Sequence, residues 1–483
     1  MIITEFSLQF KILERLSMRI FRAALFCTFL SFSLPAQTAT QTAGVFTLKN
    51  RIAVPIEIMQ TSLAENENKL YLIGKQNIQL WDISANKLVK AYPHEFSPIA
   101  PIGFLGKLLD IRYPLIINAE KTKGIALLSK KENGNQTAAL WDLRSGKQVG
   151  LIYRPGKTIR SMDFSGDGKT IISTHGELAD MEIVIWDTET LSVRNSIAAR
   201  DLSWIHLSND GEKIFIGTGK ANTWAGNVLG YDDSNKIDLL NARTGKLERS
   251  FKAPGIKSGS TIGSSPTLDK DERFIAARTG DDVTVWDTNG DGTPKYVINE
   301  KVKRAYRPLR ISDDGRFLVT VPDRIINVYD IETGKLYKGI PTTDQLDSCY
   351  LSPDSRYLIK RYTGTVAVTD LESGKFLYNL SIDTYNQEDS TSGLSASYES
   401  ENAAVSPNSK FIMIYGPKQV RIFDIADGKM LQTLIDPQTV KYKDSGKLKD
   451  DGLDGMTASW IGNGDSVRVL GDSDRVYFQW DAR

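Results

Sequence analysis

A short segment of the chain carries oxygen-bearing side chains at the spacing of a calcium loop. Residues 287–292 read DTNGDG, so Asp287, Asn289 and Asp291 alternate ahead of a glycine. Such oxygens around a tight turn suit a hard cation such as Ca²⁺. The twelfth position of a calcium loop is a bidentate glutamate, and here it is Ile298. We favour a polar turn without metal, because Asn, Asp and Gly are common turn formers, and keep calcium as the alternative.

Other residue types that support catalysis are few and scattered. His94, His175 and His206 are the three histidines, and they share no metal-ligand spacing. The sequence has no G-x-S-x-G elbow, no G-x-x-x-x-G-K-[ST] phosphate loop and no C-x-x-C pair. We expect Cys349 to be a buried, inert thiol. The sequence therefore assigns no catalytic residue and no cofactor.

One turn, in contrast, is repeated along the whole chain. LWDLRSGK (140–147), VYDIETGK (328–335) and IFDIADGK (422–429) share an apolar run, an aromatic-Asp step and a Gly-Lys turn. Five of the 8 tryptophans stand directly before this aspartate, and by subtraction neighbouring repeats lie 40 to 60 residues apart. Such repetition indicates one structural unit used many times. The aspartate-like position falls at Asp82, Asp142, Asp187, Asn241, Asp287, Asp330, Asp370, Asp424 and Asp481.

Each complete repeat predicts four short antiparallel strands. Upstream of the Trp-Asp step, segments such as FSGDGKTIIS (164–173) and LSPDSRYLIK (351–360) place hairpin-type turns between β-rich runs. Third strands such as EIVIWD (182–187) are apolar on both faces, so the sheets must be covered on both sides. Small sheets that cover one another around a ring form an all-β β-propeller.

Together, the Trp-Asp strand ends and SPDG-like turns resemble degenerate WD40-type repeats, of the quinoprotein or YVTN kind. The resemblance covers nearly everything after about Gly44, and counting third strands gives one propeller of nine blades, with eight as the alternative. The Gly-His step that the family places before the first strand is almost absent, and His94 is its only candidate. The family's buried His–Asp network therefore cannot recur in most blades. We expect the repeated aspartates to accept backbone hydrogen bonds in their turns.

The two ends of the repeat region predict how the ring closes. The sequence stops at Arg483 directly after a third strand, so the last blade lacks its fourth. The segment VFTLKN, which begins at Val45, has no sheet of its own before it. Because an unpaired edge strand is a liability, we expect Val45–Lys49 to join the last blade.

Composition argues against several classes of protein. Hydrophobic residues make up 41% and charged residues 25%, as in soluble globular proteins. A net charge of +1 offers no electrostatic basis for binding nucleic acid. No apolar run after residue 40 approaches the ~20 residues of a membrane helix, so we expect no transmembrane segment after signal cleavage.

The N-terminus has the pattern of a secretory signal. Two arginines after Met18 precede an apolar stretch, Ala23–Leu34, that ends near small residues. We interpret 1–36 as a signal peptide whose true start is Met18, 37–43 as a linker and 44–483 as the propeller domain; a membrane-anchoring helix is the alternative. One cysteine would remain after cleavage, and an exported protein without disulfides fits a bacterial periplasm.

Connection lengths are unequal. Long insertions fall before first strands (93–107, 381–400, 435–456) and between second and third strands (217–236), and in a propeller these two classes emerge on the same face. Long loops on a rigid scaffold commonly carry binding function. Aromatic and acidic residues make these insertions a candidate partner-binding set. Its members are Trp224, Tyr231, Asp232, Asp233, Tyr385, Tyr398 and Tyr442.

We therefore predict a non-enzymatic, exported scaffold that binds a protein partner through the long-loop face. One alternative is a propeller enzyme such as a lactonase or other sugar-acid hydrolase acting at the central channel, which would need clustered carboxylates or a metal. The other is a propeller that senses small ligands such as sugars or peptides.

The signal interpretation is tested by N-terminal sequencing of the exported protein. We expect the first residue to lie between Gln37 and Gly44, because signal peptidase removes the apolar segment. A protein that begins at Met1 would contradict export.

Overall fold

The computed structural model describes residues within 45–482. Contacts divide the chain into Met1–Gly44 and Val45–Arg483, so the predicted signal and linker lie outside the described residues. The described range has gaps at 55–57, 65–67, 75, 95, 98–99, 102–114, 129–135, 177–179, 200–201, 219–222, 225–226, 229–235, 254–265, 280–281, 301–307, 344–345, 363, 382–402, 417–418, 435–456 and 472–475.

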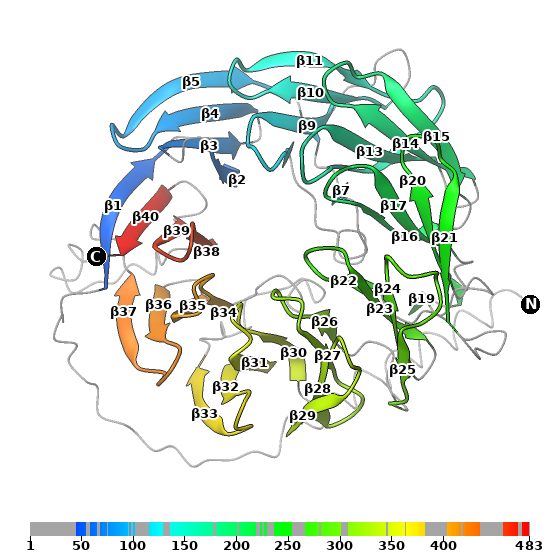
Figure 1. Cartoon of the computed structure of the whole chain (residues 1–483). Coiled ribbons are helices and arrows are strands. Elements are labelled where there is room, and N and C mark those ends of the chain that lie inside the picture. Colours follow the sequence, from blue (N-terminus) through cyan, green and yellow to red (C-terminus); the bar gives the residue numbers. More distant parts are fainter. Residues whose placement is uncertain are drawn as a thin grey trace, which may run out of the picture. The chain divides into compact units, whose positions relative to one another are not determined.

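The described strands form nine main sheets around a ring (Figure 1). In blade 3, strands β12 (Ile159–Phe164), β13 (Thr170–His175), β14 (Met181–Asp187) and β15 (Val193–Ala199) pair in this order from the inside of the ring to its outside. The other blades repeat this antiparallel order. The prediction of nine blades is confirmed, and the eight-blade alternative is wrong.

The remaining strands have the following bounds. Blade 1 contains β2 (Ile58–Leu63), β3 (Lys69–Gly74), β4 (Asn77–Asp82) and β5 (Lys87–Pro93), and blade 2 contains β6 (Phe96–Ser97), β8 (Ile116–Ile117), β9 (Lys123–Leu128), β10 (Ala138–Asp142) and β11 (Lys147–Ile152). Blade 4 contains β16 (Leu202–Leu207), β17 (Lys213–Thr218), β20 (Lys236–Asn241) and β21 (Leu247–Lys252), and blade 5 contains β22 (Thr267–Leu268), β23 (Phe274–Thr279), β24 (Asp282–Asp287) and β25 (Tyr296–Ile298). Blade 6 contains β26 (Leu309–Ile311), β27 (Phe317–Thr320), β28 (Ile325–Asp330) and β29 (Leu336–Pro341), and blade 7 contains β30 (Leu346–Leu351), β31 (Tyr357–Tyr362), β32 (Thr365–Asp370) and β33 (Phe376–Ser381). Blade 8 contains β34 (Ala403–Val405), β35 (Phe411–Gly416), β36 (Gln419–Asp424) and β37 (Met430–Leu434), and blade 9 contains β38 (Thr457–Ile461), β39 (Ser466–Gly471), β40 (Val476–Ala482) and β1 (Phe46–Ala53). Three short strands lie outside this order: β7 (Ala100–Pro101), β18 (Thr223–Trp224) and β19 (Asn227–Val228).

The apolar core lies between blades. All six residues of β13 and of β23 are buried, whereas the outer strand β5 is almost entirely exposed. Between blades 2 and 3, Leu140 and Ile152 pack with Ile171 and Val184. Full burial of one such side chain contributes about 1.5–3 kcal/mol, so each blade depends on its neighbours for stability.

The repeated aspartates behave as predicted. Oδ1 of Asp187 accepts hydrogen bonds from the backbone N–H groups of Glu189 and Thr190, both at 2.9 Å. Asp330 accepts one from Thr333 at 2.8 Å, and Asn241 substitutes for aspartate in blade 4 with the same acceptor role. These bonds fix the turn that returns the chain to the outer strand.

The SPDG-like turns are also built alike. The Ser165 hydroxyl donates to Asp167 at 2.6 Å and accepts from the N–H of Thr170 at 3.1 Å. Gly168 adopts a φ of 67°, a conformation that favours glycine. Equivalent Ser–Asp or Ser–Asn pairs recur in blades 4, 6, 7 and 8.

A β-bulge bends the outer strand in eight of the nine blades. In blade 6, Val328 pairs with Lys338 but Tyr329 pairs with Leu336, so Tyr337 is the extra residue. Bulges and lysines make an exposed edge a poor template for another strand. Lys335 precedes this edge directly, as lysines do in several other blades.

Strand β1 closes the ring by pairing with β40, as predicted. The pairing runs from Phe46 opposite Ala482 to Ala53 opposite Val476, so the strand continues beyond the expected Lys49. Phe46 is 2% exposed, and its ring centroid lies 5.5 Å from that of Phe411 in blade 8.

We expect the closing strand to contribute strongly to stability. Phe46→Ala and Ile52→Ala should each lower the free energy of unfolding by about 2–5 kcal/mol, since both truncate fully buried side chains. Chemical denaturation measures this. Lys49→Gln is the control, because it removes only a surface ion pair to Asp481 and should cost under about 1 kcal/mol. Equal effects of all three variants would contradict closure by apolar packing.

Candidate functional site

Most of the predicted partner-binding set lies outside the described residues. This applies to Tyr231, Asp232, Asp233, Tyr385, Tyr398 and Tyr442. Trp224 lies on β18, where its backbone pairs with Asn227 of β19. The structure therefore does not bring these residues together or separate them.

The strand order nevertheless places the connections that carry these residues. In a four-stranded antiparallel blade, the first-to-second and third-to-fourth turns lie on one face, and the other two connection classes lie on the opposite face. In blade 3 the two turns of the first kind are 165–169 and 188–192. Connections of the second kind include 382–402 and 435–456. The observed topology thus places the short turns on one face and the long connections on the other.

The calcium-like segment follows blade 5's third strand. Oδ1 of Asp287 accepts from the N–H of Asn289 at 2.9 Å, and Oδ1 of Asp291 accepts from the N–H and hydroxyl of Thr293 at 2.8 and 2.6 Å. Among the residues that the structure describes, no group of three or more His, Cys, Asp or Glu side chains is placed to hold a metal. The two carboxylates serve the turn itself.

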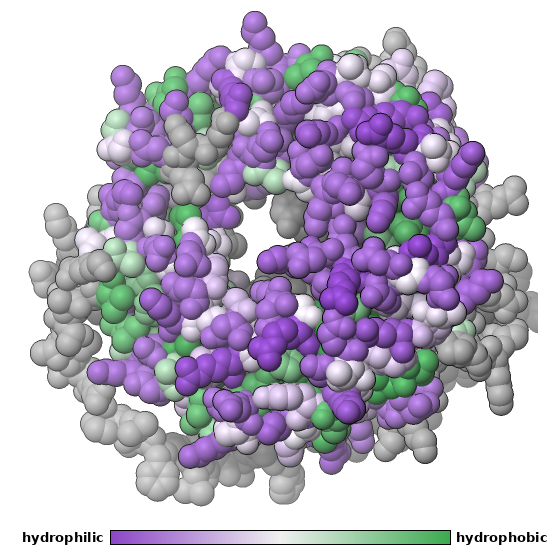
Figure 2. Space-filling view, viewed as in Figure 1, coloured by the Kyte–Doolittle hydropathy of each residue, from purple (hydrophilic) through white to green (hydrophobic). Residues whose placement is uncertain are grey.

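The central channel is lined by the first strands of the blades, and Figure 2 shows its opening in a largely hydrophilic face. In the wall of this channel, titratable side chains from blades 3, 4 and 5 lie close to one another. His206 Nε2 lies 2.8 Å from Glu272 Oε1, and that carboxylate also accepts from the N–H of Asn209. Burial raises the pKa of the nearby Asp163 to about 6, while the adjacent N–H of Phe164 and the charge of His206 act in the opposite direction. This contact joins consecutive blades and was not predicted.

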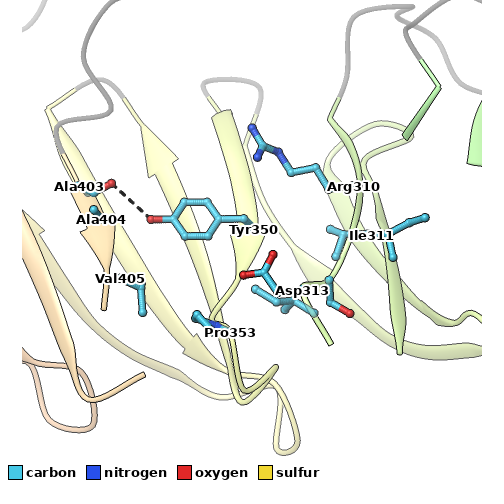
Figure 3. Close-up of a pocket in the computed structure, with 11 residues that line it drawn as sticks. Arg310, Ile311, Asp313, Tyr350, Pro353, Ala403, Ala404 and Val405 are labelled. Carbon is cyan, nitrogen blue, oxygen red and sulfur yellow. Dashed lines mark hydrogen bonds between the residues drawn. The ribbon is translucent and has the colours of Figure 1, made fainter. Parts of the chain in front are cut away.

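A pocket of about 240 Å³ lies at the channel between blades 6, 7 and 8. It is lined by the inner strands β26, β30 and β34 and by the turns that follow the first two (Figure 3). Arg310, Asp313 and Tyr350 are its main polar side chains. The sequence signal for it was weak: Arg310 is a charged residue within an otherwise apolar first strand.

Blade 3 contains a buried polar chain that begins at a Trp-Asp tryptophan. Trp186 Nε1 donates to the Ser173 hydroxyl at 2.7 Å, and that hydroxyl lies 2.7 Å from His175 Nε2. The histidine comes from the second strand instead of the preceding connection. Burial lowers the pKa of His175 to about 4. His94, the predicted candidate, is also buried, and its ring stacks on Phe96 with centroids 3.8 Å apart.

A buried glutamate, Glu300, lies in the connection between β25 of blade 5 and β26, the first strand of blade 6. Glu300 lies 3.6 Å from the guanidinium of Arg278 in blade 5, and both side chains are 1% exposed. Its other carboxylate oxygen accepts from Thr320 and, at 3.2 Å, from Tyr329. Removing one partner of a buried ion pair leaves an uncompensated charge, so this pair holds the connection to the two blades.

Cys349 lies on the inner strand β30 and is fully buried. Its predicted burial is confirmed. Within the described residues, the structure contains no helix with the length and apolarity needed to cross a membrane.

Of the comparisons with known proteins, only the one with solved structures found matches. No protein-family model matches the chain, and no curated protein matches it. A solved structure described as the crystal structure of the eukaryotic initiation factor is similar with a TM-score of 0.54 and 11% identity, over 79% of this chain and 88% of the other. Dihydro-heme d1 dehydrogenase NirN is similar with a TM-score of 0.47 and 12% identity, over 80% and 78% of the two chains. The first of these two similarities supports the propeller fold alone.

His175 and Asp163 should have opposite effects on the free energy of unfolding as the pH falls. The pKa of His175 is lowered to about 4 in the fold, so the unfolded chain takes up its proton first and stability is lost between about pH 6.5 and 4. The pKa of Asp163 is raised to about 6, so the fold takes up this proton first and stability is gained between about pH 6 and 4. Each effect is on the order of 3 kcal/mol.

We therefore expect opposite pH responses from two variants. Relative to the unaltered protein, His175→Gln should gain stability, and Asp163→Asn should lose it, as the pH falls from 7 to 4.5. The measurement is the free energy of unfolding by denaturant at each pH. Identical pH profiles for the two variants would show that neither shift is present.

Proposed function

We propose that the chain is an exported, non-enzymatic, WD40-like propeller that binds a protein partner through its long-loop face. The proposal is carried by the one-sided growth of the connections. One face of the ring keeps five-residue turns such as 165–169, whereas connections such as 382–402 and 435–456 belong to the other. A scaffold that varies one face and holds the other constant is the usual design of a binding module.

The construction of the ring supports a scaffold role. Its repeated aspartates bind their own turns, as at Asp187 and Asp330, and its buried ions pair between blades, as Arg278 does with Glu300. These polar groups stabilise the ring. Interface anchors would then be supplied by the connections, where Trp224 and Tyr231 share one insertion.

The proposed location is a bacterial periplasm. It is supported by the arginines and apolar stretch after Met18, and by the single cysteine that would remain after cleavage. That cysteine is buried in β30, where it is shielded from oxidation.

An enzyme acting at the central channel is the second candidate. It is favoured by the raised pKa of Asp163 beside His206, because perturbed carboxylates in clefts are candidate acids or bases. A lactonase or other sugar-acid hydrolase would use such a group.

A double variant tests the binding face. Trp224→Ala with Tyr231→Ala should weaken binding of a partner recovered from periplasmic extract by roughly 30-fold or more, since aromatic anchors commonly cost ~2 kcal/mol or more when truncated. The midpoint of thermal unfolding should hardly change, because the proposal places both side chains at the partner surface, where truncation leaves no core cavity. Affinity is measured by titration calorimetry at constant salt.

The control is Lys169→Ala with Lys335→Ala, on the short-turn face. Lys169 is well exposed, and this variant should bind as the unaltered protein does. Equal affinity of both double variants would contradict the long-loop face as the binding surface. A fall in thermal stability of the first variant would show that Trp224 belongs to the scaffold.

A further inference from the structure

The pocket between blades 6, 7 and 8 combines opposite charges with apolar walls. Arg310 and Asp313 are both exposed, and Figure 3 shows their side chains extending into the same space beside Tyr350. Neither side chain forms a hydrogen bond or ion pair with another residue that the structure describes. Ile311 and Val405 contribute apolar surface. A cation and an anion that face one pocket without a partner among the described residues suit a ligand that carries both complementary charges.

The backbone of the pocket wall offers a second kind of recognition. Strands β26, β30 and β34 each stand at the end of their sheets, so each pairs with a neighbouring strand on one side only. The opposite side faces the channel. On β34 the carbonyls of Ala403 and Ala404 already accept from Tyr350 and Trp460, so the N–H and C=O groups of β26 and β30 are those that can pair with an extended peptide. The Tyr350 hydroxyl lies 3.5 Å from the carbonyl of Ala403 and connects blades 7 and 8 across the pocket (Figure 3).

Blade 3 shows this edge occupied. There the short strand β7 pairs in parallel with the inner strand β12, with Ala100 opposite Ser161 and Pro101 opposite Met162. Two extended residues of the chain itself are thus seated on the channel edge of a blade. The corresponding edges of blades 6, 7 and 8 carry no such strand among the described residues.

We propose that this pocket binds a short peptide with free termini, about two residues long. Arg310 receives the terminal carboxylate, Asp313 receives the terminal ammonium group, and the apolar walls receive a small aliphatic side chain. The open strand edge pairs with the peptide group. A volume of about 240 Å³ is below the roughly 300–1,000 Å³ of pockets for drug-sized ligands, which fits a ligand of this length.

The lining of this site contains none of the residues in the predicted partner-binding set. Asp313 lies in the short turn between β26 and β27, and Pro353 lies in the equivalent turn of blade 7. The two proposals can therefore fail independently.

The test is calorimetric titration of the full chain with alanyl-valine and its two blocked forms. The free dipeptide should bind, and N-acetylation or C-amidation should each weaken binding about tenfold, because each removes one charge-assisted contact. Arg310→Gln should abolish the difference between the free and amidated peptides only. Asp313→Asn should abolish the difference between the free and acetylated peptides only.

Two matched variants serve as controls. The first is Asp347→Asn: Asp347 lies on the same inner strand as Tyr350 but outside the pocket. The second is Arg316→Gln: Arg316 lies directly before β27, outside the pocket, with its guanidinium over the Phe317 ring. Both should keep the preference for the free dipeptide. The proposal is overturned if the free dipeptide does not bind at millimolar concentration, or if Arg310→Gln and Asp313→Asn retain both preferences. Trp224→Ala with Tyr231→Ala should bind the dipeptide normally, whatever its effect on a protein partner.

Discussion

No blade of this ring can cover its own apolar faces. In blade 3 the second and third strands are largely buried on both sides, and the side chains that cover them come from the next sheet in either direction. The stability of each blade therefore depends on its neighbours, and every apolar face is covered only when the first and last blades are in contact. The pairing of β1 with β40 meets this requirement, and the regularity of the individual blades is useful only because of it.

The features that could be predicted from the sequence are those that depend on residues within one repeat. Turn aspartates such as Asp187, hairpin serines such as Ser165 and the two-sided burial of third strands depend on neighbours a few residues away. Ring closure was also predictable, because one missing strand and one spare strand stood at opposite ends of the repeat region. Its length was underestimated, since the pairing past Lys49 depends on the register with β40.

Contacts between blades were beyond sequence reasoning. Arg278 with Glu300, Asp163 near His206, and the pocket beside Tyr350 each unite side chains from different repeats. No periodicity marks such partners, because each repeat contributes a variable residue at a constant position. His175 illustrates the point: the family pattern directs attention to the connection before the first strand, whereas the buried histidine of blade 3 lies on the second strand. The candidate partner-binding residues were chosen from loop length and residue type, and apart from the backbone of Trp224 they lie outside the described residues.

Closure by β1 also dictates an order of events in time. The strand at Phe46–Ala53 is among the first parts of the propeller to be synthesised, and its partner at Val476–Ala482 is the last. Eight blades can form as the chain lengthens, while the ninth must wait for the final strand. This one contact spans nearly the entire chain, and contacts of such high sequence separation form slowly. Until then, the nascent chain leaves an apolar sheet face uncovered at each end of the row of blades, so the interval before ring closure is when it is most prone to associate with other chains.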